Sequence, residues 1–224
     1  MITDQEILFL DDNYLVANKM SGIPAHATRD TRRPHFFAMI QTYLRGKNIL
    51  EGEVAMHHRL DLETSGVMIF SLSAEARKVL DLLFKERKIF KFYHGVVVNH
   101  PVSEHGIMED FLAPDKNKKQ ERMIKVERGG QKAITHFKME KSWEHSALLH
   151  FELLTGRKHQ IRVQCALRGM PIVGDKLYGD QIFNQKFSVS RQMLHASQIV
   201  FRDPISGKLI DVKSPHPFQS WPAK

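Results

Sequence analysis

The 224-residue chain contains one cysteine, Cys165, so no disulfide can form within it. A chain so poor in cysteine is typical of the reducing cytoplasm, which is where we expect this protein. No apolar stretch approaches the roughly 20 residues that a transmembrane helix needs. The N-terminus has no basic segment followed by a long apolar run. We therefore expect no membrane partner and no signal peptide.

The motifs of common cofactors and nucleophiles are also missing. The sequence contains no P-loop, no G-x-G-x-x-G after a strand, no H-E-x-x-H and no G-x-S-x-G. Thirteen histidines are present, but no H-x₃-H spacing or C-x-x-C pair points to a zinc site. The expectation is a protein without a metal, ATP, NAD or a serine nucleophile.

What the sequence does have is positive charge. Lysine and arginine number 33 against 25 acidic residues, which gives a net charge of +8 and a pI near 9.6. This charge favours nucleic acid as the partner, with an anionic membrane second and a basic protein without either as the alternative. The residues that could neutralise nucleic-acid phosphates, unless they only solvate the surface, are Arg29, Arg32, Arg33, Lys116, Lys118, Lys119, Arg122, Lys125 and Arg128.

Most of the expected strands follow one another without intervening helices. Apolar periodicity predicts helices over 35–46, 73–87 and within 155–171, with Ser73 as a cap of the second. We expect a hairpin over 7–19 and strands over 67–73, 88–98, 122–127, 133–140, 146–155, 195–201 and 208–215. This order predicts an α+β fold with a mixed, largely antiparallel sheet, and the lack of a clear linker favours a single domain over 1–224. The basic stretch 114–141 could form a sub-lobe or an extended hairpin.

The stretch HHRLDLETSG, residues 57–66, places Asp61 two residues after Arg59 and just before a Thr-Ser-Gly turn. The hydroxyls of Thr64 and Ser65 could hydrogen-bond back to the loop and fix the carboxylate. A fixed carboxylate can act as a nucleophile or a base, and the arginine could reach a phosphate. The alternative is an Asx-type turn that leads into a strand.

A second stretch, LLTGRKHQIRVQCALRG, places Arg157, Lys158, His159 and Arg162 at the start of an amphipathic helix. A solvated basic helix is one interpretation. Because the helix is also apolar, at least one of these cations is expected to face a cleft, and a desolvated arginine needs a carboxylate partner. Asp61 is a candidate for that partner.

Taken in order, HRLDLETSG, KFYHGVV and LLTGRKHQIRVQCALRGMPIVGDKLYG closely resemble the RluA-type family of RNA pseudouridine synthases. The similarity extends from LDDNYLVANKMSG near the N-terminus to LHASQIVF near the C-terminus. It implies the pseudouridine synthase fold and a short member without an S4-type RNA-binding domain. The positions that depart from the family pattern, and so put the choice of substrate in question, are Met20, Lys158 and Gln164.

The resemblance also implies roles for five residues. Asp61 matches the catalytic aspartate, and Arg162 matches the arginine that pairs with it. Tyr93 matches the tyrosine that stacks on the target uracil, although a core aromatic is the alternative, and its hydroxyl is a candidate base for the C5 proton. Arg59 matches an arginine that replaces the flipped-out nucleotide, and Ile161 matches an apolar residue of the uracil pocket.

The expected function is the isomerisation of uridine to pseudouridine in a tRNA or rRNA stem-loop, by a monomer without an obligate protein partner. This reaction consumes no electrons, phosphates or external atoms, in agreement with the missing cofactor motifs. Asp61 could add to C1′ or remove the 2′ proton, and the sequence leaves both open. The rival functions are a non-catalytic RNA-binding protein and a glycoside hydrolase with Glu63 as its second acid.

Overall fold

The computed structural model describes residues 2–28, 30, 32–49, 54–116 and 122–221. The chain forms two compact units, the first made of Met1–Phe90 with Ala196–Pro215 and the second of Lys91–His195 with His216–Lys224. The backbone therefore passes from one unit to the other three times. No linker in the sequence predicts this division, because each crossing falls in or beside a strand. No described helix is both long and apolar enough to cross a membrane.

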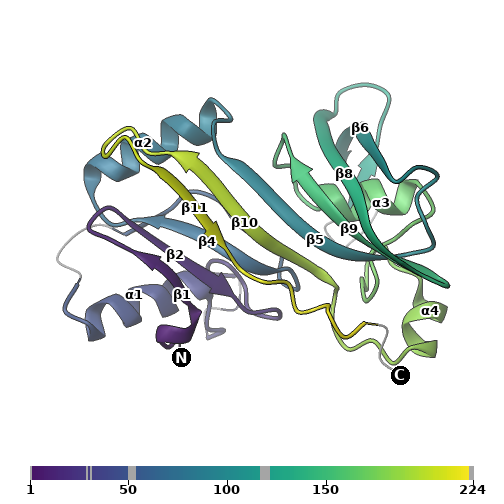
Figure 1. The fold of residues 1–224 in the computed structure, drawn as a ribbon, viewed down its shortest axis with the longest axis horizontal. Coiled ribbons are helices and arrows are strands. Elements are labelled where there is room, and N and C mark those ends of the chain that lie inside the picture. The colour runs from purple at the N-terminus through teal and green to yellow at the C-terminus, as the bar shows by residue number, and fades with distance from the viewer. Residues whose placement is uncertain (1, 29, 31, 50–53, 117–121, 222–224) are drawn as a thin grey trace. The chain divides into compact units, whose positions relative to one another are not determined.

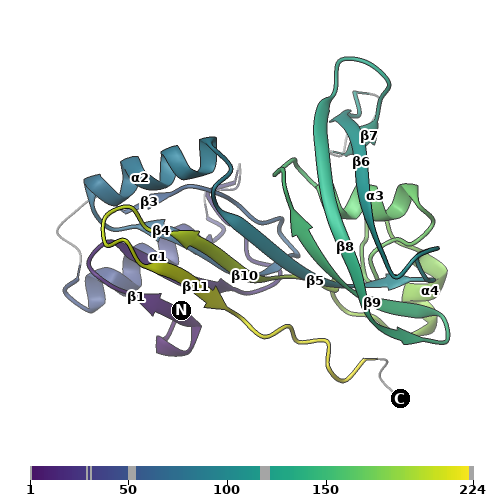
Figure 2. The ribbon, with the colours of Figure 1, turned by 45° about the horizontal axis from the view of Figure 1, so that its top comes forward.

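The first unit is built on a sheet with the strand order β1-β2-β4-β10, and β11 lies beside β10 (Figure 1). The short strand β3, labelled in Figure 2, pairs with β4. Strands β1 and β2 form an antiparallel hairpin, as do β10 and β11. Both pairs were predicted from the sequence and are confirmed. After a short 3-10 helix, Asp4–Glu6, the strands of this unit are β1 (Ile7–Leu10), β2 (Tyr14–Lys19), β3 (Ala55–Met56), β4 (Ser65–Ser71), β10 (Leu194–Arg202) and β11 (Leu209–Lys213).

Two helices cover opposite faces of this sheet (Figure 1). Helix α2 (Ala74–Lys85) packs Leu80 against Val67 and Ile69 of β4. Helix α1 (Phe36–Gly46) contacts the other face of β4, where the ring centroids of Phe36 and Phe70 lie 6.0 Å apart. Successive strand residues point to opposite faces, so β4 is buried along its whole length. Both helices confirm the ranges predicted from apolar spacing.

Gly66 lets two strands of the first unit approach closely. Its φ of +117° lies in a region that side chains avoid. A Cβ built there would overlap the backbone of Ala196 in the neighbouring strand β10. The glycine of the Thr-Ser-Gly turn is therefore required by the packing of β4 directly after the loop that carries Asp61.

The second unit has the strand order β5-β9-β8-β6-β7. The antiparallel pair β6 and β8 forms a long hairpin, and helix α3 lies alongside it (Figure 2). The α+β class with a largely antiparallel sheet, predicted from the sequence, is confirmed. The elements of this unit are β5 (Phe90–Val98), β6 (His105–Pro114), β7 (Met123–Lys125), β8 (Gln131–Trp143), β9 (Ser146–Leu153), α3 (Gln160–Leu167) and α4 (Gln181–Lys186).

Strand β6 and helix α4 were not predicted from the sequence. The alternation of polarity along β6 is broken, since Asp110 is buried beside Met108 and Leu112 while Ile107 and Phe111 are exposed. A strand with an acid on its buried face and apolar residues on its exposed face shows no clear alternation in its sequence. Helix α4 has only six residues, too few to show an apolar period in the sequence. Its N-cap is Asp180, whose side chain accepts the backbone N–H of Phe183, but an aspartate among polar residues does not by itself predict a helix.

A histidine cluster in the second unit gives stability a dependence on pH. His94 Nε2 lies 3.1 Å from Glu140 Oε2, and its ring centroid lies 4.9 Å from that of His150 and 4.6 Å from that of His216. Burial lowers the pKa of His94 to about 4, with Glu140 opposing this shift and the other two imidazoles adding to it. Burial also lowers the pKa of His216.

We expect the free energy of unfolding to fall as the pH is lowered from 7 to 4. Below its ordinary pKa near 6.5 an unfolded His94 binds a proton that the folded side chain rejects until about pH 4. The loss from this group amounts to about 1–3 kcal/mol across that window. Urea unfolding at pH 7 and 4.5 measures it, with the variant His94→Gln as the control. An equal acid-induced loss in both proteins contradicts the assignment.

Candidate active site

Asp61 lies in the loop between β3 and β4 of the first unit, half-buried, while Arg59 beside it is exposed. Leu60 between them is buried and anchors the loop to the core. The backbone N–H of Thr64 donates to the carbonyl of Asp61 over 3.2 Å and closes the turn. The loop therefore has a buried apolar anchor on one side of Asp61 and a closed turn on the other.

A buried lysine fastens this loop to the end of β2. The Lys19 side chain is fully buried, and its Nζ donates to the carbonyls of Met20 (2.9 Å), Ile23 (2.8 Å) and Leu62 (3.2 Å). The carbonyl of Leu62 also accepts the backbone N–H of Gly22 over 2.9 Å. An ammonium taken out of water keeps its hydrogen-bond partners close. The buried ammonium of Lys19 therefore fixes the backbone of Leu62, the residue directly after Asp61.

The segment after Lys19 adds a further contact. The Ser21 hydroxyl donates to the carbonyl of Glu63 over 2.7 Å and to its carboxylate over 3.1 Å. The expectation that the Thr64 hydroxyl holds the turn is wrong. That hydroxyl is buried and makes no hydrogen bond within the described chain, because the backbone of Thr64, not its side chain, reaches back to Asp61. Lys19 and Ser21 hold the residues after Asp61 instead of Thr64, and the local sequence around Asp61 contains neither. The predicted role of the Ser65 hydroxyl stays a prediction.

Tyr93 and Ile161 belong to the second unit and are both buried. Tyr93 lies in β5 opposite Phe151 of β9, with 8% of its surface exposed. Ile161 lies on α3 with 3% exposed. Burial of this degree fits a core aromatic as well as a ring at the bottom of a pocket, so the stacking role of Tyr93 stays a prediction.

Arg162, one residue further along α3, forms a buried ion pair with Asp175. Its Nε donates to Oδ2 of Asp175 over 2.7 Å and its Nη2 donates to Oδ1 over 3.0 Å, with side-chain exposures of 10% and 0%. Burial alone would raise the pKa of Asp175. The opposing effect is larger, because Arg162, through its hydrogen bonds and charge, and the backbone N–H groups of Leu177 and Tyr178 together bring the pKa below its ordinary value. The carboxylate therefore stays ionised.

The sequence predicts a carboxylate partner for Arg162, but the predicted partner was Asp61 and not Asp175. The rule that a desolvated arginine requires a carboxylate applies equally to the acid in Gly-Asp-Lys-Leu-Tyr-Gly at 174–179. The predicted pair of Arg162 with Asp61 joins residues of the two units and stays a prediction.

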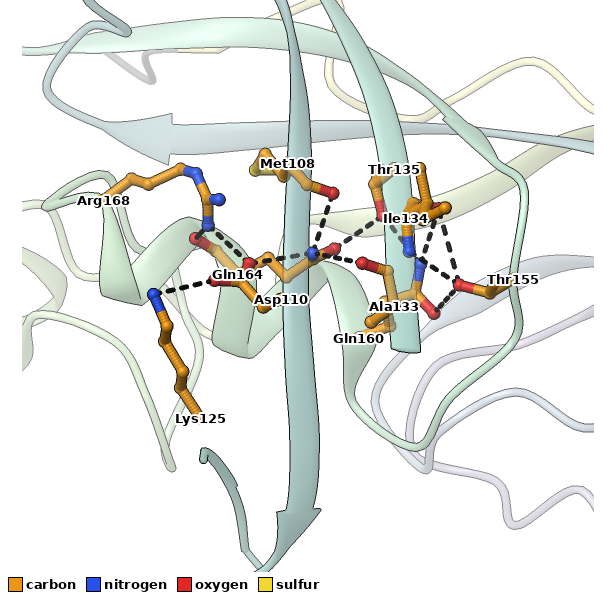
Figure 3. A network of polar contacts seen from close by, with 10 residues as sticks. All are labelled: Met108, Asp110, Lys125, Ala133, Ile134, Thr135, Thr155, Gln160, Gln164 and Arg168. Atoms are coloured by element: carbon orange, nitrogen blue, oxygen red, sulfur yellow. Dashed lines mark hydrogen bonds and ion pairs between the residues drawn. The ribbon is translucent and has the colours of Figure 1, made fainter. Parts of the chain in front are cut away.

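The opposite face of α3 carries a network of buried polar groups (Figure 3). Gln160, Gln164 and Arg168 follow at i, i+4 and i+8 and so share one side of the helix. The side-chain nitrogen of Gln164 faces Asp110 Oδ2 and the carbonyl of Met108, both over 3.0 Å. These contacts fasten the helix to β6.

The same network reaches β8 and β7. The Thr135 hydroxyl donates to Oε1 of Gln164 over 2.7 Å and accepts from the nitrogen of Gln160 over 2.8 Å. Asp110 accepts from Arg168 over 2.9 Å and lies 3.5 Å from Nζ of Lys125. Helix α3, which carries Ile161 and Arg162, is thereby held in one register against the hairpin.

A sequence comparison then decides the family. The model of the RNA pseudouridylate synthase family matches residues 13–167, a span that contains both the Asp61 loop and helix α3. The chain belongs to this family. The RluA-type resemblance is confirmed, and the protein is an RNA pseudouridine synthase, an isomerase that acts on RNA.

Characterised and uncharacterised relatives agree with this assignment. The enzyme is 33% identical over 217 residues to the uncharacterised RNA pseudouridine synthase YhcT of Bacillus subtilis, a match that covers 95% of this chain and 68% of the relative. It is 31% identical over 220 residues to ribosomal large subunit pseudouridine synthase D of Zymomonas mobilis, covering 95% and 69%. The fold matches human RNA pseudouridylate synthase domain containing 4 with a TM-score of 0.78 and 24% identity, covering 96% and 89% of the two chains.

A second set of side chains in the enzyme looks catalytic but is not. His57 Nε2 lies 2.9 Å from the Ser71 hydroxyl, and its Nδ1 lies 2.9 Å from Asp81 Oδ1, the order of a serine hydrolase triad. Ser71 lies within strand β4 with none of its surface exposed, so no substrate can reach the hydroxyl. The three residues join β4 to α2 and carry no hydrolase activity.

The basic residues predicted to bind RNA are partly engaged within the enzyme. Arg33 donates to the carbonyl of Gly22 over 3.1 Å, and Arg122 lies 5.1 Å from the ring centroid of Tyr178. The described residues contain no group of three or more His, Cys, Asp or Glu side chains placed to hold a metal ion. The predicted residues Arg29, Lys118 and Lys119 lie outside the described chain.

The network around Gln164 yields a prediction about the stability of the enzyme. The variant Gln164→Leu keeps the size of the side chain but removes one hydrogen-bond partner each from buried Asp110, Thr135 and the carbonyl of Met108. We expect the free energy of unfolding, measured in urea, to fall by about 2–4 kcal/mol. In the control variant Gln198→Leu an exposed hydrogen bond is lost, and the change stays below about 0.5 kcal/mol. Similar losses in both variants contradict the role of the network.

Proposed function

We propose that this enzyme flips specific uridines out of structured RNA and isomerises them to pseudouridine with Asp61 as the reacting carboxylate. The observation that carries the proposal is the family match over residues 13–167 together with the loop that holds Asp61. Three different groups, Lys19, Ser21 and Gly22, bind the two residues after Asp61. A fixed carboxylate of this kind is what a reaction at a sugar carbon requires.

The first candidate substrate is ribosomal RNA. Two relatives are named ribosomal large subunit pseudouridine synthases, the Zymomonas mobilis protein and a 31% identical protein from Buchnera aphidicola. A hairpin of large-subunit rRNA is therefore the substrate to test first, and a tRNA stem-loop is the second. We place the enzyme in the cytoplasm, because it has a single cysteine and ribosomal RNA would be its substrate. We expect it to act there as a monomer.

The reaction rearranges one nucleotide and its atoms balance without a cofactor. The bond from N1 of uracil to C1′ breaks, the base rotates and C5 joins C1′. The C5 proton is then released, and N1 takes up a proton in its place. In one route the ionised Asp61 adds to C1′, and in the other it removes the 2′ proton. Arg162 supports either route as a fixed cation in the uridine site.

Three further residues serve access to the base. Extruding a nucleotide from a helix costs a few kcal/mol. Arg59 is exposed beside Asp61 and fills the vacancy in the RNA. Stacking on an aromatic ring contributes about 1–3 kcal/mol to the binding of an extruded base, and this is the role of Tyr93. Ile161 forms the apolar wall of the uracil pocket.

The test is product analysis on RNA transcripts labelled with tritium at C5 of uridine. The wild-type enzyme is expected to release tritium from a large-subunit rRNA transcript, and chromatography of the digested RNA is expected to show pseudouridine. Tight RNA binding without tritium release identifies a non-catalytic RNA-binding protein. Free uracil with a residual abasic sugar identifies a glycoside hydrolase.

A further inference from the structure

We propose that Asp175 and Tyr178 are positioning residues for Arg162, fixing the plane and direction of its guanidinium for the reaction. This inference rests on the proposed function, in which Arg162 acts in the uridine site. Arg162 is buried on α3 and meets Asp175 through two hydrogen bonds of 2.7 and 3.0 Å. Two bonds to one planar group determine its plane, so the directions of its other N–H groups are set at the same time.

The carboxylate that does this is itself immobile. Oδ1 of Asp175 accepts the backbone N–H groups of Leu177 over 2.8 Å and of Tyr178 over 3.0 Å. These bonds form a turn of the chain around the carboxylate, whose surface is 1% exposed. A side chain fixed by its own turn before it meets Arg162 loses little further freedom on pairing. Asp175 therefore acts as a rigid support for Arg162.

Tyr178 supports the flat side of the same guanidinium. The central carbon of the Arg162 guanidinium lies 5.2 Å from the ring centroid, within the range of a cation–π contact. The hydroxyl of Tyr178 accepts the backbone N–H of Met123 over 2.7 Å and lies 2.9 Å from Nδ1 of His159. The ring is thus held at both ends, by the backbone of its turn and by its hydroxyl.

His159 gives the arrangement a backbone component. It precedes α3 with a φ of +53°, the left-handed region, and its side chain caps no backbone group of the helix. Such a conformation in a residue other than glycine persists where the surroundings hold it. The contact of its ring with Tyr178 supplies that hold. The start of α3 and the face of Arg162 are therefore fixed by the same tyrosine.

The test compares steady-state kinetics and RNA affinity of variants that fold. For Asp175→Asn we expect kcat to fall about 100-fold, with KM and the Kd for RNA within about threefold, because misplacing a group by about 1 Å costs that much in rate. Asp175→Glu keeps the charge and is expected to recover about tenfold. The control is Asp203→Asn. Like Asp175, Asp203 is a buried carboxylate that accepts two backbone N–H groups, but its further partner is a tyrosine hydroxyl and not an arginine. This control variant is expected to lower stability without changing kcat.

A second pair of variants keeps the inference testable if Asp175→Asn does not fold. Tyr178→Leu removes the ring under Arg162 without touching the ion pair, and kcat is expected to fall about tenfold. Tyr178→Phe restores the ring and is expected to recover most of that loss. An active wild type whose kcat is unchanged by Asp175→Asn and Tyr178→Leu, or lowered as much by Asp203→Asn, overturns this inference alone. A wild type that forms no pseudouridine overturns the proposed function and this inference with it.

Discussion

The variant Asp61→Asn is expected to release no measurable tritium from RNA labelled at C5 of uridine, a loss of at least about 1,000-fold in kcat. Asparagine has the shape of aspartate but can neither add to C1′ nor take up the 2′ proton. The loop around it should persist, because Lys19, Ser21 and Gly22 bind the residues that follow. RNA affinity is expected to stay within about threefold, since phosphate contacts supply most of it.

The matched control for this experiment is Glu63→Gln. Glu63 is the neighbouring acid, and its carboxylate accepts a hydrogen bond of 3.1 Å from Ser21, which a glutamine can also accept. We expect this variant to keep at least a tenth of the wild-type rate. If Asp61→Asn retains activity, position 61 is not catalytic. If both variants lose activity equally, two acids act together, as a glycoside hydrolase mechanism requires.

The variant Lys19→Met is expected to lower the free energy of unfolding by about 2–4 kcal/mol and kcat by about 100-fold. Methionine fills the space of the buried stem but donates no hydrogen bond. The carbonyls of Met20 and Ile23 then lose the ammonium, and Leu62, next to Asp61, loses one of its two donors. The loop that carries the carboxylate should shift as a result.

Urea unfolding and tritium release on the same preparation measure both effects. The control is Lys47→Met, which removes an exposed ammonium that lies 2.9 Å from Asp4. Such surface pairs contribute little, so we expect its stability and activity to stay near the wild type. A Lys19→Met protein as stable and as active as the control would show that the Asp61 loop does not depend on the buried ammonium.

The sequence predicted those elements whose polarity matched their burial. The hairpin around β1 and β2, helices α1 and α2 and the last strand pair have apolar residues where the core lies, and the predicted ranges agree with the observed ones. Strand β6 departs from this match, because buried Asp110 belongs to the network that holds α3. Its polarity follows from contacts with α3 that local sequence does not report.

In the candidate site, too, local sequence patterns mark some residues, whereas others are recognised only by the contacts that the fold creates. Asp61 and Arg162 stand in motifs and could be named from the sequence. Lys19, Asp175 and Tyr178 act through contacts 13 to 43 residues apart in the chain, and no local pattern predicts which carbonyl or carboxylate such a side chain will meet. The positions that we propose to act in the reaction were therefore visible in the sequence, whereas the positions that hold them required the fold.

The split of the first unit into Met1–Phe90 and Ala196–Pro215 bears on how the protein is made. The last segment supplies Ile199, Phe201, Ile210 and Val212 to a core that α2 and β4 begin. At about 5–20 residues per second, a ribosome needs roughly 5–20 s to translate the intervening residues. During that time β4 lacks its neighbour, β10, and exposes an edge that can pair with another chain. A nascent chain that stalls before residue 196 is therefore a substrate for chaperones or proteases.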